Sequence, residues 1–354
     1  MGLITRRGLG RLAGAGLAVG ASNRALAATG AATTKPFDPT PYVNPELRPY
    51  LTAVRRFTGG RSLTLETLPI ERKANFATPI KAAPVWAERV IPGPAGAPDV
   101  RVYVINAGAP DAAPRPAILQ IHGGGFVLGS ARRQIGDNQA LALELDCVIV
   151  SVEYRLAPET RFPGALEDNY AALKWLHQNA DDLGVDRARI AVMGESAGGG
   201  HAAMLAIAAR DRGEIPLAYQ ALIYPMLDDR TGSTHRKPPY MGLVIWDEQR
   251  NRFGWSCLLG VPAGSAKVPH GSVPARVENL KGLPPAFIGV GSIDLFVDED
   301  IDYARRLIDA GVVVRLNVVP GAFHGFDAFA GAAIAKAFRA DLVASLREGL
   351  KAKA

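Results

Sequence analysis

The chain has 354 residues, of which 48% are hydrophobic and 21% are charged, so its composition is that of a globular protein rather than a disordered or fibrous one. Its formal net charge is +6, but the first 27 residues carry four arginines and no acid, which leaves +2 for the remainder. This charge gives no reason to expect a nucleic-acid partner or an anionic membrane surface.

Residues 1–27 are predicted to be an export signal. Arg6 and Arg7 precede a weakly apolar run over 12–21, and Ala25-Leu26-Ala27 fits a signal-peptidase cleavage site. The run is much shorter than the ~20 residues that a membrane-spanning helix needs, so we expect cleavage and no stable membrane anchor. The two arginines resemble a twin-arginine signal, which predicts a periplasmic or secreted protein. An ordinary secretory signal is the alternative.

From residue 85 onward, short apolar strands alternate with helical segments. The expected strands are Trp86–Ile91, Val100–Ile105, Ala117–Ile121, Cys147–Val152, Ile190–Met193, Ala218–Tyr224, Ala286–Val290 and Val312–Val319. The expected helices are Ala165–His177, Ala197–Arg210, Ile301–Ala310 and Ala332–Leu350. Several strands are apolar without alternation, as is typical when helices cover both faces of a sheet. The pattern predicts an α/β fold with a doubly wound, mostly parallel, eight-stranded sheet.

Two segments do not follow this alternation. Residues 28–84 are predicted to form an N-terminal cap segment, with a helix around Pro45–Phe57, and residues 226–283 make a long excursion between two strands. Structureless loops of that length are improbable in a compact domain. Both segments are therefore expected to lie over the carboxyl edge of the sheet, where α/β folds bind ligands. The catalytic domain is expected to span 85–354, with 226–283 contributing to the cap.

A nucleophile elbow is predicted at Gly194-Glu-Ser-Ala-Gly198, between an expected strand and an expected helix. A side chain two residues before or after Ser196 would clash in so sharp a turn, and glycine avoids both clashes. A glycine-rich turn with a solvated serine is the alternative, which the flanking strand and helix disfavour. Serine is a poor nucleophile unless a base removes its proton.

The acid and the base are expected later in the chain, each in a loop that follows a strand. Asp294 follows the seventh strand and His324 the eighth, so both can converge on Ser196. Asp294 would orient the His324 ring, and His324 would act as general base and then as general acid. Asp298 also competes as the acid, but it opens a helix and is expected to be its N-cap. His201 is expected to pack within the helix layer.

Three glycines, Gly123–Gly125, follow the third strand directly after His122. The backbone N–H groups of Gly123 and Gly124, together with that of Ala197, are predicted to form an oxyanion hole, because bare backbone lets a carbonyl oxygen approach closely. A valine at position 124 is expected to fill this hole and leave the fold intact. His122 is expected to hold the loop through side-chain hydrogen bonds.

These motifs, taken in order, resemble those of the hormone-sensitive-lipase-like family of bacterial type IV carboxylesterases. They are His122-Gly-Gly-Gly125, Tyr154-Arg-Leu-Ala-Pro-Glu159, Phe162-Pro163, Gly194-Glu-Ser-Ala-Gly198, Asp294 and His324-Gly-Phe326. The similarity covers roughly residues 84 to 350. It implies an α/β-hydrolase fold with an N-terminal cap, no cofactor, and hydrolysis of short- to medium-chain carboxylic esters through an acyl-enzyme intermediate.

The chain departs from the family pattern at two places. Glu195 stands where the family often has Asp, and Asp294-Leu-Phe stands where it often has Asp-Pro-Leu. The second departure leaves the catalytic assignment intact and concerns local loop geometry. Residues 154–159 are expected to brace the loops beneath the site rather than to take part in the chemistry.

Three other functions fit the same fold. An amidase or peptidase would use the same triad, because only leaving-group protonation and pocket shape differ. A lipase would use apolar residues of the excursion as a mobile entrance, and a non-catalytic protein would bind a small ligand without cleaving it. No spacing of Cys or His suggests a metal site, and the sequence does not decide whether Cys147 and Cys257 pair. The expected partner is a small-molecule ester, and a homodimer is compatible with the sequence.

Overall fold

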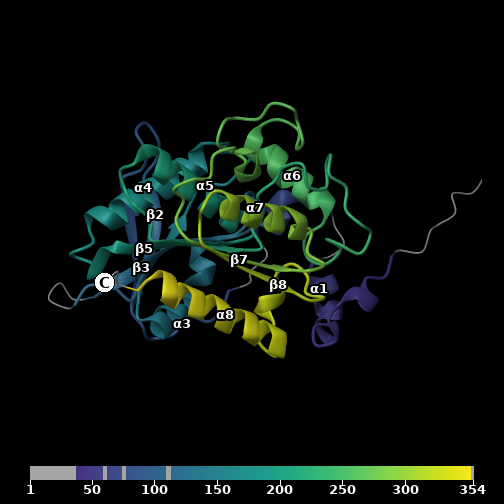
Figure 1. Ribbon diagram of the computed structural model, residues 1–354, viewed down its shortest axis with the longest axis horizontal. Coiled ribbons are helices and arrows are strands. Elements are labelled where there is room, and N and C mark those ends of the chain that lie inside the picture. Colours follow the sequence, from purple (N-terminus) through teal and green to yellow (C-terminus); the bar gives the residue numbers. More distant parts are fainter. Residues whose placement is uncertain (1–36, 59–61, 74–76, 109–112, 352–354) are drawn as a thin grey trace, which may run out of the picture. The chain divides into compact units, whose positions relative to one another are not determined.

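The computed structural model describes residues 37–58, 62–73, 77–108 and 113–351, which Figure 1 shows as a ribbon. The predicted export signal lies outside these residues. The strands are β1 Trp86–Ile91, β2 Val100–Ile105, β3 Arg115–Ile121, β4 Val148–Glu153, β5 Val185–Glu195, β6 Tyr219–Ile223, β7 Ala286–Gly291 and β8 Val314–Val319. The α-helices are α1 Leu51–Thr58, α2 Leu68–Glu71, α3 Ile135–Leu145, α4 Gly164–Gln178, α5 Ala197–Arg212, α6 Glu248–Leu259, α7 Val297–Asp309 and α8 Ala333–Gly349. Short 3₁₀ helices include Arg48–Tyr50 and Phe326–Ala328.

The strands form one eight-stranded sheet in the order β1-β2-β4-β3-β5-β6-β7-β8. β2 is antiparallel to both β1 and β4, and the pairs from β4 to β8 are all parallel. The predicted α/β hydrolase sheet, eight-stranded and mostly parallel, is confirmed.

Helices cover both faces of the sheet, and each face has its own apolar core. Alternate residues of one strand face opposite cores, so Leu119 of β3 packs in the core beneath α4, α5 and α7, and Ile118 packs in the core beneath α3 and α8. Figure 1 shows α3 and α8 together on one side of the sheet and α4, α5 and α7 on the other. Burial on both faces explains why these strands are apolar without alternation.

The parallel strands bring their carboxyl ends to one edge of the sheet. β3, β5, β7 and β8 end at residues 121, 195, 291 and 319, and the loops that follow them carry the predicted site residues. In open α/β sheets this edge is where ligands bind. The loops are far apart in the sequence, and the parallel pairing brings them together.

The sequence pattern did not predict α3. Two of its buried residues are polar and hydrogen-bonded: Asn138 Nδ2 donates to Gln120 Oε1 of β3 at 3.3 Å, and Gln139 Nε2 donates to the carbonyl of Pro84, ahead of β1, at 2.7 Å. Polar residues on the inner face remove the apolar periodicity by which a helix is recognised.

The two irregular segments both contain helices. The helix predicted around Pro45–Phe57 is present as a 3₁₀ turn at Arg48–Tyr50 that leads into α1, and the excursion over 226–283 contains α6. Gln249 of α6 exchanges two hydrogen bonds with the backbone of Leu63, so the two segments contact each other. Among the helices that the structure describes, none combines the length and the apolar composition that a membrane-spanning helix requires.

Candidate active site

Ser196 lies at the junction of β5 and α5 with φ 57° and ψ −121°. A non-glycine residue rarely adopts a positive φ, and such strain is typical of functional sites. A Cβ at Gly194 would lie 2.3 Å from the backbone of Gly198, and a Cβ at Gly198 would lie 2.1 Å from the Ile121 carbonyl at the end of β3. The turn therefore needs glycine at both positions.

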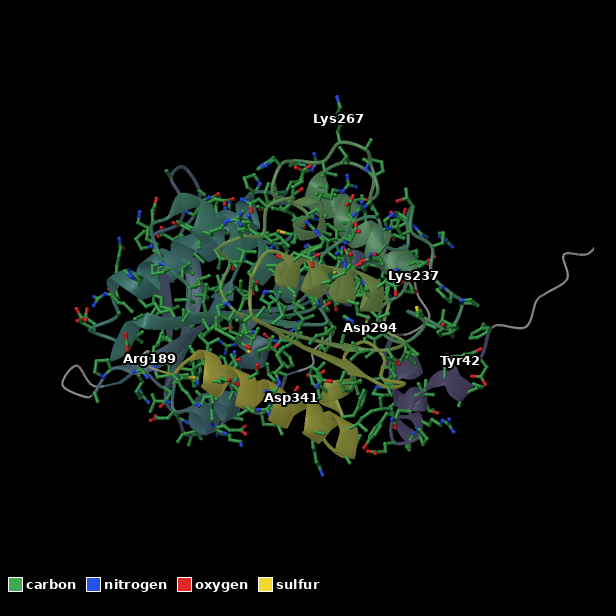
Figure 2. All side chains as sticks on the ribbon, in the orientation of Figure 1. Tyr42, Arg189, Lys237, Lys267, Asp294 and Asp341 are labelled. Carbon is green, nitrogen blue, oxygen red and sulfur yellow. The ribbon has the colours of Figure 1, made fainter. Side chains whose placement is uncertain are left out.

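Three side chains from three loops form a chain of hydrogen bonds. His324 Nε2 lies 2.9 Å from Ser196 Oγ, and His324 Nδ1 lies 2.8 Å from Asp294 Oδ2. Asp294 is fully buried, whereas Figure 2 shows Lys267 projecting outward from the excursion. The backbone N–H of Phe296 donates to the second carboxylate oxygen of Asp294 at 3.1 Å. The arrangement can move a proton from the serine to the imidazole and stabilise the resulting cation.

Two aromatic rings pack against the His324 imidazole. Tyr224 and Phe296 contact it edge to face, with centroid distances of 4.7 and 5.2 Å. The Tyr224 hydroxyl donates to Asp327 Oδ1 at 2.7 Å, so the loop that carries His324 is also tied to the end of β6. The imidazole is therefore fixed by packing as well as by Asp294.

The loop after β3 lies against the nucleophile elbow. A Cβ at Gly123 would be 2.8 Å from the Glu195 carbonyl and 3.4 Å from Ser196 Cβ, so this glycine allows the close approach. Ala197 is the first residue of α5, and Gly124 follows Gly123 in the loop. The three residues predicted to supply oxyanion donors thus come from two segments that meet at Ser196.

The expectation for a valine at position 124 is wrong. Gly124 has φ +126°, and its Cβ would lie 2.2 Å from the Leu128 carbonyl. A side chain there would strike the turn that follows the glycines instead of entering the hole, so it would disturb the fold of the loop itself.

The sequence profile described as the alpha/beta hydrolase fold matches residues 118–328. The chain belongs to the α/β-hydrolase family. Esterase LipI of Mycobacterium tuberculosis is 36% identical to this hydrolase over 256 residues, which cover 68% of this chain and 74% of LipI. An ethyl acetate hydrolase of Pseudomonas putida is 34% identical over 215 residues, which cover 59% of this chain and 65% of that enzyme.

A solved structure of a bacterial heroin esterase has a fold similar to that of this chain. It superposes on this hydrolase with a TM-score of 0.77 at 35% identity, covering 88% of this chain and 99% of the esterase. With these relatives, the resemblance to the hormone-sensitive-lipase-like carboxylesterases is confirmed.

The two residues that the sequence offered as rivals to Asp294 and His324 do not belong to the hydrogen-bond chain of this hydrolase. Asp298 was predicted to be the N-cap of α7, and this prediction is wrong, because the helix begins at Val297 and Phe296 is at the cap. The Asp298 carboxylate instead pairs with Lys237 Nζ at 2.7 Å. His201 is buried in α5, and burial lowers its pKa to about 3, so it stays neutral.

A partly buried polar network beneath the elbow was not predicted. Glu195 Oε2 accepts hydrogen bonds from Gln134 at 3.2 Å and from Gln120 at 3.4 Å. Burial is the main cause that raises the pKa of Glu195 to about 7, and the nearby Asp327 adds to it. The one signal in the sequence is Gln120, a polar residue within the apolar strand β3.

The described residues contain no group of three or more His, Cys, Asp or Glu side chains that could hold a metal ion, and Cys147 and Cys257 are free thiols.

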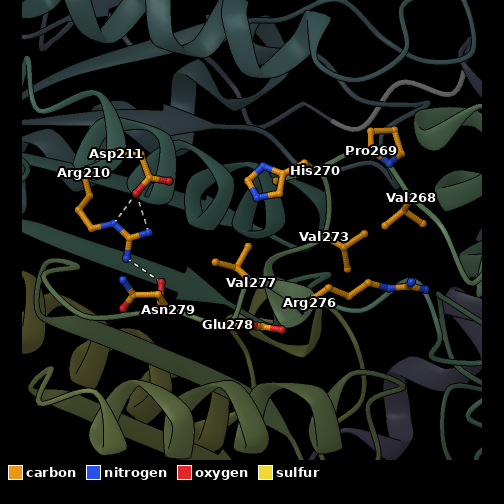
Figure 3. A pocket seen from close by; sticks show the side chains of 11 residues that line it. Arg210, Asp211, Val268, Pro269, His270, Val273, Arg276, Val277, Glu278 and Asn279 are labelled. Carbon is orange, nitrogen blue, oxygen red and sulfur yellow. Dashed lines mark hydrogen bonds and ion pairs between the residues drawn. The ribbon is translucent and has the colours of Figure 1, made fainter.

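A hollow of about 610 Å³ lies at the far end of α5, where Arg210 and Arg276 line it. In Figure 3 Arg210 pairs with Asp211. Arg210 is 14 residues along the chain from Ser196, which corresponds to roughly 20 Å of helix. This hollow is not part of the hydrolase site.

Proposed function

We propose that this hydrolase cleaves short- to medium-chain carboxylic esters, with Ser196, His324 and Asp294 as its catalytic triad. The observation that carries the proposal is the hydrogen-bond chain from Ser196 Oγ through His324 to the buried Asp294. The names of the relatives, an esterase and an ethyl acetate hydrolase among them, support ester substrates with small acyl groups.

The reaction follows from this geometry. His324 Nε2 takes the proton of Ser196 as Oγ bonds to the ester carbonyl carbon, and the carbonyl oxygen becomes an anion. The N–H groups of Gly123, Gly124 and Ala197 donate to that anion. His324 then passes its proton to the departing alkoxide, which leaves as an alcohol, and the acyl group stays on Ser196.

Water completes the cycle. His324 takes a proton from the water as its oxygen bonds to the acyl carbon, and a second oxyanion forms. Its collapse breaks the bond to Ser196 Oγ, which recovers its proton from His324, and the carboxylic acid leaves. Asp294 stabilises the imidazolium in both halves and keeps the ring in the orientation that each transfer needs.

The test is a series of p-nitrophenyl esters from acetate to palmitate, run beside matched p-nitroanilides. We expect turnover to be highest with the shorter esters and far lower with the anilides. Ser196→Ala should reduce turnover by several orders of magnitude, on the order of 10⁶ by comparison with a triad protease. Unchanged turnover in this variant would overturn the assignment. Faster anilide cleavage would favour an amidase, and a maximum with emulsified long-chain esters would favour a lipase.

We also propose that residues 1–27 direct export and that the segments over 28–84 and 226–283 cap the site. The arginine pair and the Ala25-Leu26-Ala27 site support export. Expression in a bacterial host should yield a periplasmic protein that begins at residue 28. Replacing Arg6 and Arg7 together by lysine should retain the protein in the cytoplasm, and unchanged export would exclude the twin-arginine route.

A further inference from the structure

The oxyanion loop is built from residues that cannot hold their own conformation. Gly124 and Gly125 have φ +126° and +60°, and no side chain at positions 123 to 125 packs to fix the backbone. Glycine loses more conformational freedom on folding than any other residue. Oxyanion donors act efficiently only if they are oriented before the reaction. Something outside the three glycines must therefore orient their N–H groups.

The planar peptide group shows how this can be done. In a trans peptide the C=O and the N–H point in opposite directions and rotate together. The N–H of Gly123 shares its peptide group with the His122 carbonyl, and the N–H of Gly124 shares its group with the Gly123 carbonyl. A donor that holds either carbonyl thereby sets the direction of the N–H across the same peptide.

Both carbonyls are held by side chains. The Tyr154 hydroxyl donates to the His122 carbonyl at 2.8 Å, and His122 Nδ1 lies 2.8 Å from the Gly123 carbonyl. Tyr154 and His122 are buried, and their rings stack with a centroid distance of 4.2 Å and an interplanar angle of 14°. The His201 and Tyr154 rings meet edge to face, with a centroid distance of 4.8 Å. The two donors form one rigid unit at the end of β3.

The protonation states suit this arrangement. Burial lowers the pKa of His122, so the ring is neutral and can carry its single proton on Nδ1. Burial raises the pKa of the Tyr154 hydroxyl well above its ordinary value, so it keeps the proton that it donates.

We infer that Tyr154 is a positioning residue of the oxyanion hole: its hydroxyl holds the His122 carbonyl and so aims the N–H of Gly123, and the stacked His122 ring does the same for Gly124. This inference rests on the proposed ester hydrolysis. It gives the tyrosine of the 154–159 segment a role in transition-state stabilisation beyond bracing a loop.

The central variant is Tyr154→Phe, which keeps the ring stack and removes only the hydroxyl. The matched control is Tyr219→Phe, which removes a buried hydroxyl whose partner is Ser345 Oγ at 2.6 Å, at the opposite end of the sheet. Each kcat is expressed per serine titrated to completion with a p-nitrophenyl alkylphosphonate, so a loss of folded protein does not count as a loss of rate. The wild-type protein and Ser196→Ala test the proposed function separately.

We expect Tyr154→Phe to lower kcat by about 10-fold with little change in KM, since removing a whole donor costs roughly 10²–10³. Its affinity for a trifluoromethyl ketone, which forms an oxyanion on the enzyme, should fall by the same factor. Tyr219→Phe should change neither quantity. Wild-type kcat and ketone affinity in Tyr154→Phe, in a protein that does hydrolyse esters, would overturn the inference and leave the function standing.

A second pair of variants covers the case in which Tyr154→Phe does not fold. His122→Asn keeps a donor near the place of Nδ1, and His122→Leu does not. We expect the asparagine variant to retain a several-fold higher kcat per titrated serine than the leucine variant. Equal rates in the two would show that the hydrogen bond to the Gly123 carbonyl does not matter for catalysis.

Discussion

The indole ring of Trp246 occupies the space that a side chain at position 125 would need. A Cβ at Gly125 would lie 2.0 Å from the ring atom Cη2. The same loop also contacts α6, because a Cβ at Gly254 of α6 would lie 2.4 Å from the Gly125 carbonyl oxygen. The excursion over 226–283 is thus packed directly against the loop that carries the proposed oxyanion donors, and the third glycine serves this packing.

Gly125→Ala is expected to lower both stability and kcat. The added methyl group must displace the indole, and overpacking of this kind costs about 1–3 kcal/mol. A residue other than glycine at φ +60° adds roughly 1–2 kcal/mol. Urea unfolding and ester turnover of the variant measure the two effects.

Trp246→Leu supplies the control, because it removes the ring that the methyl group would strike. In the double variant the loss from Gly125→Ala should be smaller than in the wild-type background by about 1 kcal/mol or more, a coupling that neighbouring residues typically show. If the losses of unfolding free energy in the two single variants simply add in the double variant, the contact between the indole and position 125 is not the cause of the destabilisation.

Asp294 and Asp298 offer a second matched pair. Asp294→Asn should reduce kcat by about 10⁴, as the same change does in a protease triad, because the imidazole loses the carboxylate that sets its tautomer. Asp298→Asn breaks only the ion pair with Lys237. The Asp298 side chain is 59% exposed, and exposed pairs are worth about 0–1 kcal/mol. Comparable losses in both variants would contradict the assignment of the acid.

The sheet and the three site residues could be predicted from the pattern of apolar strands and from the residues that follow each strand. Ser196, Asp294 and His324 each follow a recognisable strand, so parallel pairing was enough to place them at one edge. The contact between Gly125 and Trp246 joins residues more than a hundred positions apart, and no local pattern encodes it. The polar inner face of α3 concealed a helix, and the capping of α7 by Phe296 depends on where the loop after β7 turns, which the residue types alone do not reveal.

Glu195→Gln is expected to stabilise the protein in a pH-dependent way. The pKa of Glu195 is raised from 4.5 to about 7, so the native state binds this proton more tightly than the unfolded state does. The free energy of unfolding of the wild type therefore falls as pH rises from about 4.5 to 7, and the glutamine variant lacks this fall. The gain at neutral pH is at most about 3 kcal/mol, and less because the residue is only partly buried.

Urea unfolding at several pH values checks this prediction. The difference in unfolding free energy between Glu195→Gln and the wild type should grow across the window from 4.5 to 7 and stay constant above it. Glu144→Gln, at a carboxylate that is 42% exposed, serves as the comparison. A difference that is the same at every pH would mean that the Glu195 carboxyl titrates normally.

Arg72 links the N-terminal segment to the active-site loops, and its substitution is expected to loosen them. Its Nε donates to the Val127 carbonyl at 2.8 Å, in the turn after the three glycines of residues 123–125, and its Nη2 donates to the Ala157 carbonyl at 2.8 Å. The same guanidinium pairs with Glu159 at 2.7 Å. Because one ammonium group cannot reproduce this planar fork, Arg72→Lys should leave at least one carbonyl unsatisfied and cost about 1–3 kcal/mol.

Glu159→Gln separates the backbone bonds of Arg72 from its ion pair. The Glu159 side chain is 62% exposed, so losing this pair should cost no more than about 1 kcal/mol while both bonds to the carbonyls remain. Unfolding free energy and kcat of the two variants should therefore rank Arg72→Lys well below Glu159→Gln. If the glutamine variant were as impaired as the lysine variant, the ion pair would be what holds residues 62–73 against the loops, and the carbonyl bonds would be incidental.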